Sequence, residues 1–272
     1  MRFRPLLTAA LLPMALAACT AGVRPEAAQD KEAPLHTEVF GKVADPAWVR
    51  TLIIVIHDDG DPGARSDEAV FAQAAVNALP EALAVTILRP GHRNPNGGAS
   101  SGSRGAGKGD DFTLDRLTRL GRQIEQLKSR YPRANIVLVG DGGGAALVAD
   151  IAGLNPDTAT GILLVGCPCA LPEWRTHMAA KTADPAWRAA VDSLDPLKFA
   201  GGVSVSLRVA VLVGADDAIT PVSLSRAYVE ALTLRGIATD YRIVPGKGHA
   251  LLNDPETLSA LTRLVASLPE KS

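Results

Sequence analysis

The sequence predicts an α/β fold in which a mostly parallel sheet is flanked by helices. Short apolar runs recur along the chain, and segments of helical length separate them. The runs are continuously apolar rather than alternating, which is typical of strands that are buried on both faces in a parallel sheet. Because strands and helices alternate, right-handed crossovers are expected to join them. The expected strands are residues 52–56, 84–88, 136–139, 162–165, 209–213 and 241–244.

Three of the intervening segments carry clear helical signals. Residues 222–235 are rich in Ala and Leu and are followed by Gly236, which is typical of a helix end. Asp254 and Pro255 predict the start of a last helix, because a capping carboxylate and a first-turn proline suit that position. An earlier segment has one apolar stripe at helical spacing, formed by Leu114, Leu117, Leu120, Ile124 and Leu127.

Two stretches depart from the alternation. Residues 93–110 are rich in Gly, Ser, Asn and Arg, and this composition predicts a long loop. A solvated loop is the simpler expectation, and a loop at the mouth of a pocket is the alternative. Long loops in compact domains are commonly functional or mobile. Residues 170–206 contain Trp174 and Trp187 but no clear strand. We therefore expect a small helical insertion over one end of the sheet.

The N-terminus is typical of a lipoprotein signal peptide. Arg2 and Arg4 precede an apolar run at residues 6–17 that is too short to span a membrane comfortably. The run ends in Leu16-Ala17-Ala18-Cys19, which resembles the lipobox of bacterial lipoproteins, where the cysteine is lipidated. An ordinary signal peptide with an incidental cysteine is the alternative. No later run is long and apolar enough to span a membrane.

These features divide the chain into three parts: a signal peptide at residues 1–18, a lipid-anchored tether at residues 19–35 and one large domain at residues 36–272. The tether is rich in Ala, Glu, Pro and Lys and has no apolar period. Thr20 follows Cys19 where an inner-membrane lipoprotein would carry Asp, and this resembles lipoproteins that are sent on to the outer membrane. The domain is therefore expected to face the periplasm, held to the membrane through Cys19.

Composition excludes some partners. The formal net charge is −1, so there is no electrostatic case for nucleic acid. The mature chain keeps Cys167 and Cys169. An oxidising compartment allows a disulfide between them, but a bridge across one residue is strained, so we expect two buried thiols. Two thiols alone make a poor zinc site. We therefore expect no metal and no cofactor.

A glycine-rich turn is the most informative local motif. Residues 139–145 follow an expected strand and open a helix-like stretch, which is the setting of the nucleophile elbow Gly-x-Ser-x-Gly. Gly140 and Gly144 occupy the outer glycine positions, but Gly142 stands where the serine belongs. A tight turn that needs glycine for backbone reasons alone is the simpler explanation. The match to a dinucleotide-binding Gly-x-Gly-x-x-Gly motif is poor, because no acidic residue follows at the expected distance.

Two further residues follow the elbow in a meaningful order. Asp217 comes just after one expected strand and His249 just after the next, so both belong to the carboxyl edge of the sheet, where α/β proteins place their sites. Nucleophile, acid and histidine in this order, together with the motifs at residues 53–57, 89–92 and 214–221, resemble the α/β-hydrolase superfamily, in particular its serine hydrolases and esterases. Each residue alone has a structural alternative, as a turn carboxylate or a loop histidine.

The resemblance implies roles and also exposes departures. His249 would move the nucleophile's proton, Asp217 would orient the imidazole, and backbone N–H groups of Gly143 and Asp58 would stabilise an oxyanion. The serine, however, is Gly142, and Asp58 replaces the glycine that the family has after His57. A carboxylate at an oxyanion hole opposes the charge that the hole must stabilise.

An alternative nucleophile is Asp141. Haloalkane dehalogenases and epoxide hydrolases use an elbow Asp that forms an ester, and a shift of the turn by one residue would place Asp141 at its apex. The Trp that usually follows that Asp is here Gly142. Three functions follow: a non-catalytic or weakly active relative that binds a small ligand or a partner, an active hydrolase of ester-like bonds, and an envelope scaffold with a vestigial pocket.

Overall fold

The computed structural model describes residues 33–43, 45–59 and 67–270. The expected signal peptide, Cys19 and most of the tether lie outside the described residues, so the lipid anchor and the domain boundaries stay predictions. Within the described ranges, no helix combines the length and the apolar character that crossing a membrane requires.

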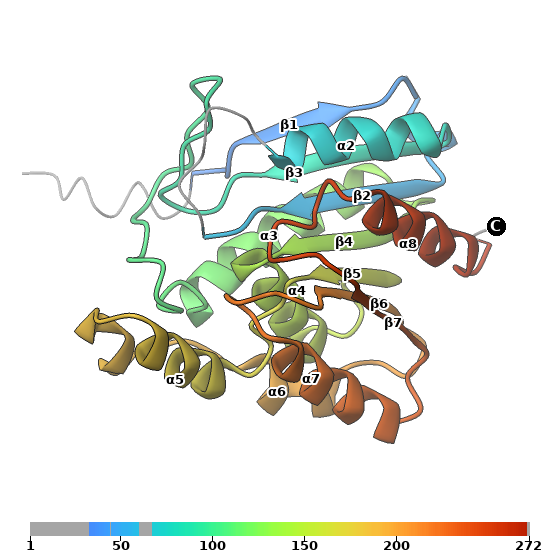
Figure 1. The fold of residues 1–272 in the computed structure, drawn as a ribbon. Helices are drawn as coiled ribbons and strands as arrows, with labels where there is room; N and C mark the ends of the chain where they lie inside the picture. The colour runs from blue at the N-terminus through green and yellow to red at the C-terminus, as the bar shows by residue number, and fades with distance from the viewer. Residues whose placement is uncertain (1–32, 44, 60–66, 271–272) are drawn as a thin grey trace, which may run out of the picture.

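The described residues form a seven-stranded sheet in the order β1-β3-β2-β4-β5-β6-β7 (Figure 1). Neighbouring strands are parallel except β1, which pairs antiparallel with β3 at the edge. The α/β prediction and all six expected strands are confirmed, whereas β1 was not expected. The strands are β1 (Thr37–Phe40), β2 (Thr51–Ile56), β3 (Ala82–Ile87), β4 (Asn135–Asp141), β5 (Gly161–Val165), β6 (Arg208–Gly214) and β7 (Thr239–Val244).

Helices cover both faces of the sheet. Helices α2 (Asp67–Ala78) and α8 (Pro255–Ala266) pack on one face, against a core that includes Ile53 and Val55 of β2. Helices α3 (Leu114–Arg130), α4 (Gly143–Leu154) and α7 (Val222–Leu234) pack on the other, against Ile54 and Ile56. Successive side chains of a strand point to opposite faces, so a continuously apolar strand fills both cores.

The helical insertion follows β5, as the sequence predicts. It contains α5 (Leu171–Lys181), α6 (Pro196–Phe199) and two short 3-10 helices, η2 (Pro185–Arg188) and η3 (Ala200–Gly202); a third, η1 (Pro46–Trp48), precedes β2. Trp174 and Trp187 pack edge to face with ring centroids 5.1 Å apart. Both are buried, so they anchor α5 and η2 to each other.

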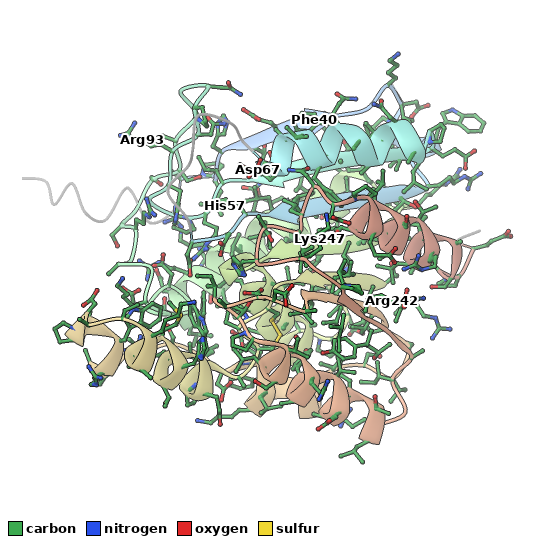
Figure 2. The ribbon with its side chains drawn as sticks, in the orientation of Figure 1. Phe40, His57, Asp67, Arg93, Arg242 and Lys247 are labelled. Carbon is green, nitrogen blue, oxygen red and sulfur yellow. A yellow bond between two sulfur atoms is a disulfide. The ribbon has the colours of Figure 1, made fainter. Side chains whose placement is uncertain are left out.

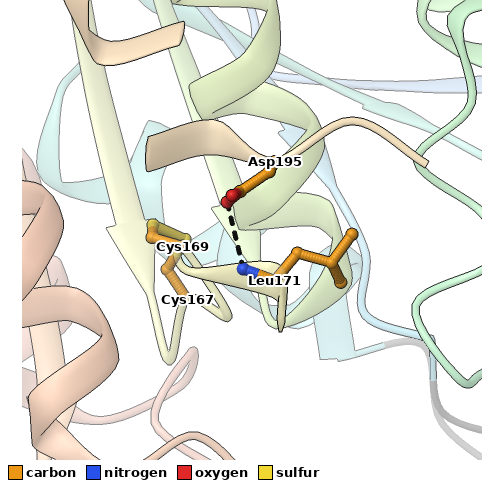
Figure 3. Close-up of a disulfide and its surroundings, with 4 residues drawn as sticks. All are labelled: Cys167, Cys169, Leu171 and Asp195. Atoms are coloured by element: carbon orange, nitrogen blue, oxygen red, sulfur yellow. Dashed lines mark hydrogen bonds between the residues drawn. A yellow bond between two sulfur atoms is a disulfide. The ribbon is translucent and has the colours of Figure 1, made fainter. Parts of the chain in front are cut away.

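A disulfide joins Cys167 and Cys169 in the turn after β5 (Figure 3). The expectation of two thiols was wrong for this structure. The turn brings the two Cα atoms to 5.1 Å, within the range that a disulfide spans. Two residues further on, the N–H of Leu171 donates to Oδ1 of Asp195 at 3.1 Å, so the bridge and this bond fix the start of the insertion.

Candidate active site

The elbow has the strand–turn–helix geometry that the motif predicts. Gly142 lies between β4 and α4 with φ at +49°, a region that favours glycine. Its N–H donates to the carbonyl oxygen of Val165 at 2.9 Å. A Cβ on Gly144 would overlap the carbonyl oxygens of Ile56 and His57, so α4 can start this close to β2 only with glycine there. Residue 142 is therefore the apex of the turn.

The side chain of Asp58 occupies this apex. Its Oδ1 accepts a hydrogen bond from the N–H of Gly143 at 2.7 Å. Its Oδ2 lies 3.5 Å from Nε2 of His249. A Cβ added to Gly142 would overlap the carboxyl group of Asp58. The carboxylate thus fills the space where an elbow side chain would stand, and it uses the amide that would serve an oxyanion.

His249 and Asp217 lie together, in the arrangement expected of an acid and a base. Nδ1 of His249 is 2.9 Å from Oδ2 of Asp217. The hydroxyl of Thr220 donates to the same oxygen at 2.7 Å, and the N–H groups of Ile219 and Thr220 donate to Oδ1 at 2.9 and 2.8 Å. Asp217 is therefore held as an ionised acceptor that orients the imidazole.

The charges of the three groups reinforce one another. Burial alone would lower the pKa of His249, but its bonds to Asp217 and Asp58 outweigh burial and raise the pKa to about 10. Burial also opposes ionisation of Asp58, yet His249 and the Gly143 N–H lower its pKa to about 2. At neutral pH an imidazolium therefore lies between two carboxylates. An imidazolium cannot accept a proton from a nucleophile, so the pair lacks a free general base.

His57 and Arg89 hold the loop that carries Asp58. His57 lies at the carboxyl end of β2 (Figure 2), and its Nε2 accepts from the N–H of Arg89 at 3.0 Å. Nδ1 of His57 therefore carries the proton and donates to the carbonyl oxygen of Asp58 at 2.7 Å. Burial and Arg89 keep the pKa of His57 well below its usual value. The Arg89 guanidinium is buried and lies 2.5 Å from Asp59.

Asp141 is the last residue of β4, one position before the apex. Burial, together with the negative charge of Asp58, raises its pKa well above the usual value. It is not among the residues that line the cavity described below, whereas Asp58 is. The geometry thus brings Asp58, rather than Asp141, against His249.

A cavity of about 300 Å³ opens above these groups. Asp58 and His249 lie at its polar end, with 32% and 22% of their side chains exposed. Trp174, Met178 and Trp187, all from the insertion, give it an apolar wall. Cavities of this size with an apolar wall and a few polar groups are typical of small-molecule sites.

The predicted long loop at residues 93–110 borders the cavity, which was the alternative to a purely solvated loop. Arg104, Ala106 and Gly107 contribute to the lining. Nη2 of Arg104 donates to the carbonyl oxygen of Asp59 at 2.8 Å, which ties the loop to the end of β2. The insertion and this loop together define the mouth of the cavity.

Comparison with solved structures identifies the fold. Esterase PE8 superposes with a TM-score of 0.62 at 17% identity, over 87% of this chain and 100% of its own. Est1E from Butyrivibrio proteoclasticus, with bound ferulic acid, gives 0.62 at 19% identity, over 85% of this chain and 92% of its own. A monoacylglycerol lipase from Paleococcus ferrophilus gives 0.57 at 18% identity, over 86% and 99%. The chain thus has the α/β-hydrolase fold.

Sequence comparison adds no closer assignment. No protein-family model matches the sequence, and no curated protein matches it. The identities to the solved structures are low, so they establish the fold and leave the chemistry to the residues of this chain. Among those residues, the inward carboxylate of Asp58 is what sequence reasoning missed. The signal was present, since Asp58 stands where the resemblance implies a glycine, beside an elbow whose apex residue, Gly142, has no side chain.

Proposed function

We propose that this chain is a lipid-anchored envelope protein that binds a small, partly apolar ligand in the cavity above Asp58 and His249. It does not carry out serine-type acyl transfer. One observation carries the proposal: the carboxylate of Asp58 replaces the elbow side chain and accepts the hydrogen bond of Gly143 at 2.7 Å. A serine-type site needs that amide free for the oxyanion and needs a neutral histidine.

The cavity supports a binding role. Its wall of Trp174, Met178 and Trp187 offers apolar and aromatic contacts, while Asp58 and His249 offer one acceptor and one donor. Such a combination selects a ligand by shape and by one or two polar groups. An esterase and a lipase share this fold, and one structure with the fold, Est1E, has bound ferulic acid, which supports an ester-like ligand.

Two matched variants test the loss of acyl transfer. Gly142→Ser alone is expected to leave hydrolysis of short-chain nitrophenyl esters unchanged, because the new side chain meets the Asp58 carboxylate. Asp58→Gly combined with Gly142→Ser frees the Gly143 amide and removes one cause of the high pKa of His249. The double variant should hydrolyse the esters at least about 10-fold faster than the single one and react with a fluorophosphonate probe. Labelling of the unmodified protein at the elbow would overturn the proposal.

The lipid anchor is tested separately. In a bacterial host, the chain is expected to incorporate labelled palmitate and to fractionate with outer membranes, because its first residues match a lipobox that ends at Cys19. Cys19→Ser should abolish both. Palmitate incorporation that persists in Cys19→Ser would show that another residue carries the lipid.

A further inference from the structure

Strand β7 is the last strand of the sheet, and one side of its backbone faces outward. The carbonyl oxygens of Ala238 and Val244 accept from N–H groups in and just after β6, at 3.2 and 2.9 Å, so both point toward β6. Backbone groups alternate in direction along a strand, and the pairing with β6 is continuous. The N–H and C=O groups of Thr239, Tyr241 and Ile243 therefore point away from the sheet, and no other strand of the described residues pairs with them.

This edge lacks the usual features that prevent pairing with another strand. Natural edge strands are commonly interrupted by proline or by a bulge, or they carry charges that repel a neighbour. β7 contains neither Pro nor Gly, and its register with β6 is regular over all six residues. Its charged residues are Asp240 and Arg242, of opposite sign and two positions apart; Arg242 lies at this edge in Figure 2. The edge can therefore accept a strand whose charges match.

We propose that β7 pairs antiparallel with β7 of a second copy of this chain, so that one sheet continues through a dimer with its two-fold axis at Tyr241. In this register Tyr241 faces its own copy, and Thr239 faces Ile243 of the second copy. Every outward N–H and C=O group of the three residues then has a partner, because opposite residues whose groups face each other exchange both hydrogen bonds. A shift by two residues in either direction leaves Thr239 or Ile243 opposite a position outside β7.

The same register matches the charges. Asp240 of each copy lies opposite Arg242 of the other, in the non-hydrogen-bonded pairs where the Cα atoms are only about 4.5 Å apart and opposite charges are favourable. A shift by two residues would place Asp240 or Arg242 opposite its own copy, and like charges in that position are destabilising. Within one chain, Asp240 already binds Arg242 and Arg263, at 2.6 and 2.9 Å, so the dimer joins two such clusters into one row of alternating charges.

Packing on the two faces of β7 agrees with this pairing. Tyr241 packs against the core beneath α7, and Val244 packs against the core beneath α8. Thr239 and Ile243 therefore lie on the α7 face, where they become neighbours across the axis as a β-branched pair. Ile243 is 38% exposed in the single chain, so the pairing covers apolar surface. Helix α7 packs on both β6 and β7, so the axis also brings α7 toward its copy and adds contact that a strand pair alone lacks.

Other candidate edges and strands fit less well. The opposite edge strand, β1, has four residues, and Glu38 is its one charged residue, so it has no matched pair of charges. The proposed dimer also leaves both cavities accessible at separate places. Because the paired β7 strands run in opposite directions, the carboxyl edges of the two copies, and with them the cavities, lie on opposite sides of the continuous sheet.

Reversal of single charges tests the register. The oligomeric mass of the full chain, kept in a mild detergent, is measured by light scattering over a range of concentrations. We expect a dimer, and we expect Asp240→Arg and Arg242→Asp each to raise its dissociation constant at least about 10-fold, because like charges then face each other at both symmetric positions. Arg122→Asp, at an exposed position of α3, makes the same charge change away from β7 and should leave the dimer intact. An unmodified chain that is monomeric at every concentration overturns the proposal.

Mixing the two variants gives a sharper test. Asp240→Arg and Arg242→Asp should together form a heterodimer, because each reversed residue then faces a residue of opposite charge in the other chain. The double variant Asp240→Arg/Arg242→Asp should dimerise with itself again for the same reason. This recovery also shows that the single variants fold, which circular dichroism checks independently. Single variants that dimerise as well as the unmodified chain, or a mixture that gives no heterodimer, would reject this register.

The backbone pairing has its own measurement. Amide hydrogen exchange of Thr239, Tyr241 and Ile243 should be at least about 10-fold slower in the dimer than after dilution to monomer, whereas the amide of Arg242, which points toward β6, should exchange slowly in both. Ile243→Pro removes an outward N–H without removing a bond to β6, so it should dissociate the dimer and keep the circular dichroism spectrum of the fold. A dimer in which the three outward amides exchange as fast as in the monomer is held by another surface, and the proposal is then wrong.

Discussion

At the scale of single residues, the site depends on two residues whose geometries fit each other. Gly142 leaves the elbow apex empty, and Asp58 fills it from a neighbouring strand end. A side chain at residue 142 would overlap the Asp58 carboxylate, so this position of Asp58 requires glycine at residue 142. With both present, His249 gains a second anionic neighbour in addition to Asp217. With both residues in place, His249 is a protonated donor rather than a base.

The protonation of His249 tests this arrangement directly. Its ring should remain protonated until the pH approaches 10, because Asp217 and Asp58 both stabilise the imidazolium. Asp58→Asn should lower that pKa by roughly 1–2 pH units, since one of the two opposite charges is lost. The measurement is an NMR titration of the ring in both proteins. An equal midpoint in the two would show that Asp58 does not contact His249 in solution.

At the scale of elements, helices α4 and α7 bury polar groups that have no partner among the described residues. Both carboxyl oxygens of Asp150 on α4 are unsatisfied, as are the hydroxyls of Ser225 and Tyr228 on α7. Burial, reinforced by the charge of Asp195, raises the pKa of Asp150 to about 8. Burying these groups without partners therefore carries a cost in stability, and the part that comes from Asp150 increases with pH.

Asp150→Asn should relieve the part of this cost that comes from ionisation. The folded-state pKa exceeds the unfolded one, so the unfolding free energy of the unmodified protein falls as pH rises from about 4 to about 8. The variant lacks that loss. The difference in the free energy of unfolding between the variant and the unmodified protein should therefore shift in favour of the variant by at least about 2 kcal/mol from pH 5 to pH 8. Urea denaturation at the two pH values measures it. Asp157→Asn, at an exposed position, is the control and should show no such change.

Helices and strands could be predicted from the sequence where their buried residues form a continuous apolar run or stripe. The five buried strands β2 to β6 and the stripe on α3 have strong apolar signals, whereas β1 is an edge strand with a charged Glu38 and no apolar run. Helix α2 is built largely from alanine, so its buried face stands out little in a pattern of apolar residues. The positions of Asp217 and His249 at the carboxyl edge of the sheet could be predicted from the order of the strands. The inward direction of the Asp58 side chain could not be predicted in this way, because it depends on how β2 and α4 pack.

At the scale of the whole molecule, the site links pH to global stability, and His249 supplies the test. Its pKa is about 10 in the folded protein and about 6.5 in an unfolded chain. The folded state therefore binds more protons between these values, so this stabilisation is complete below pH 6.5 and is lost as pH rises through 10. The loss is at most about 5 kcal/mol, at about 1.4 kcal/mol for each pH unit between the two pKa values.

Comparison with His249→Gln isolates this term. Urea denaturation at pH 6, 8 and 9.5 should show the unmodified protein losing its advantage over the variant as pH rises, by at least about 1 kcal/mol across the series. His36→Gln, at a histidine beside β1, serves as the control and should parallel the unmodified protein. At acid pH, the contribution of ionised Asp58 to the free energy of unfolding is lost as pH falls toward 2, because the pKa of Asp58 in the folded protein lies below its value in the unfolded chain. Parallel curves for the His249 variant and the unmodified protein would show that no imidazolium is held between Asp58 and Asp217, and the ligand-binding proposal would then lose its electrostatic basis.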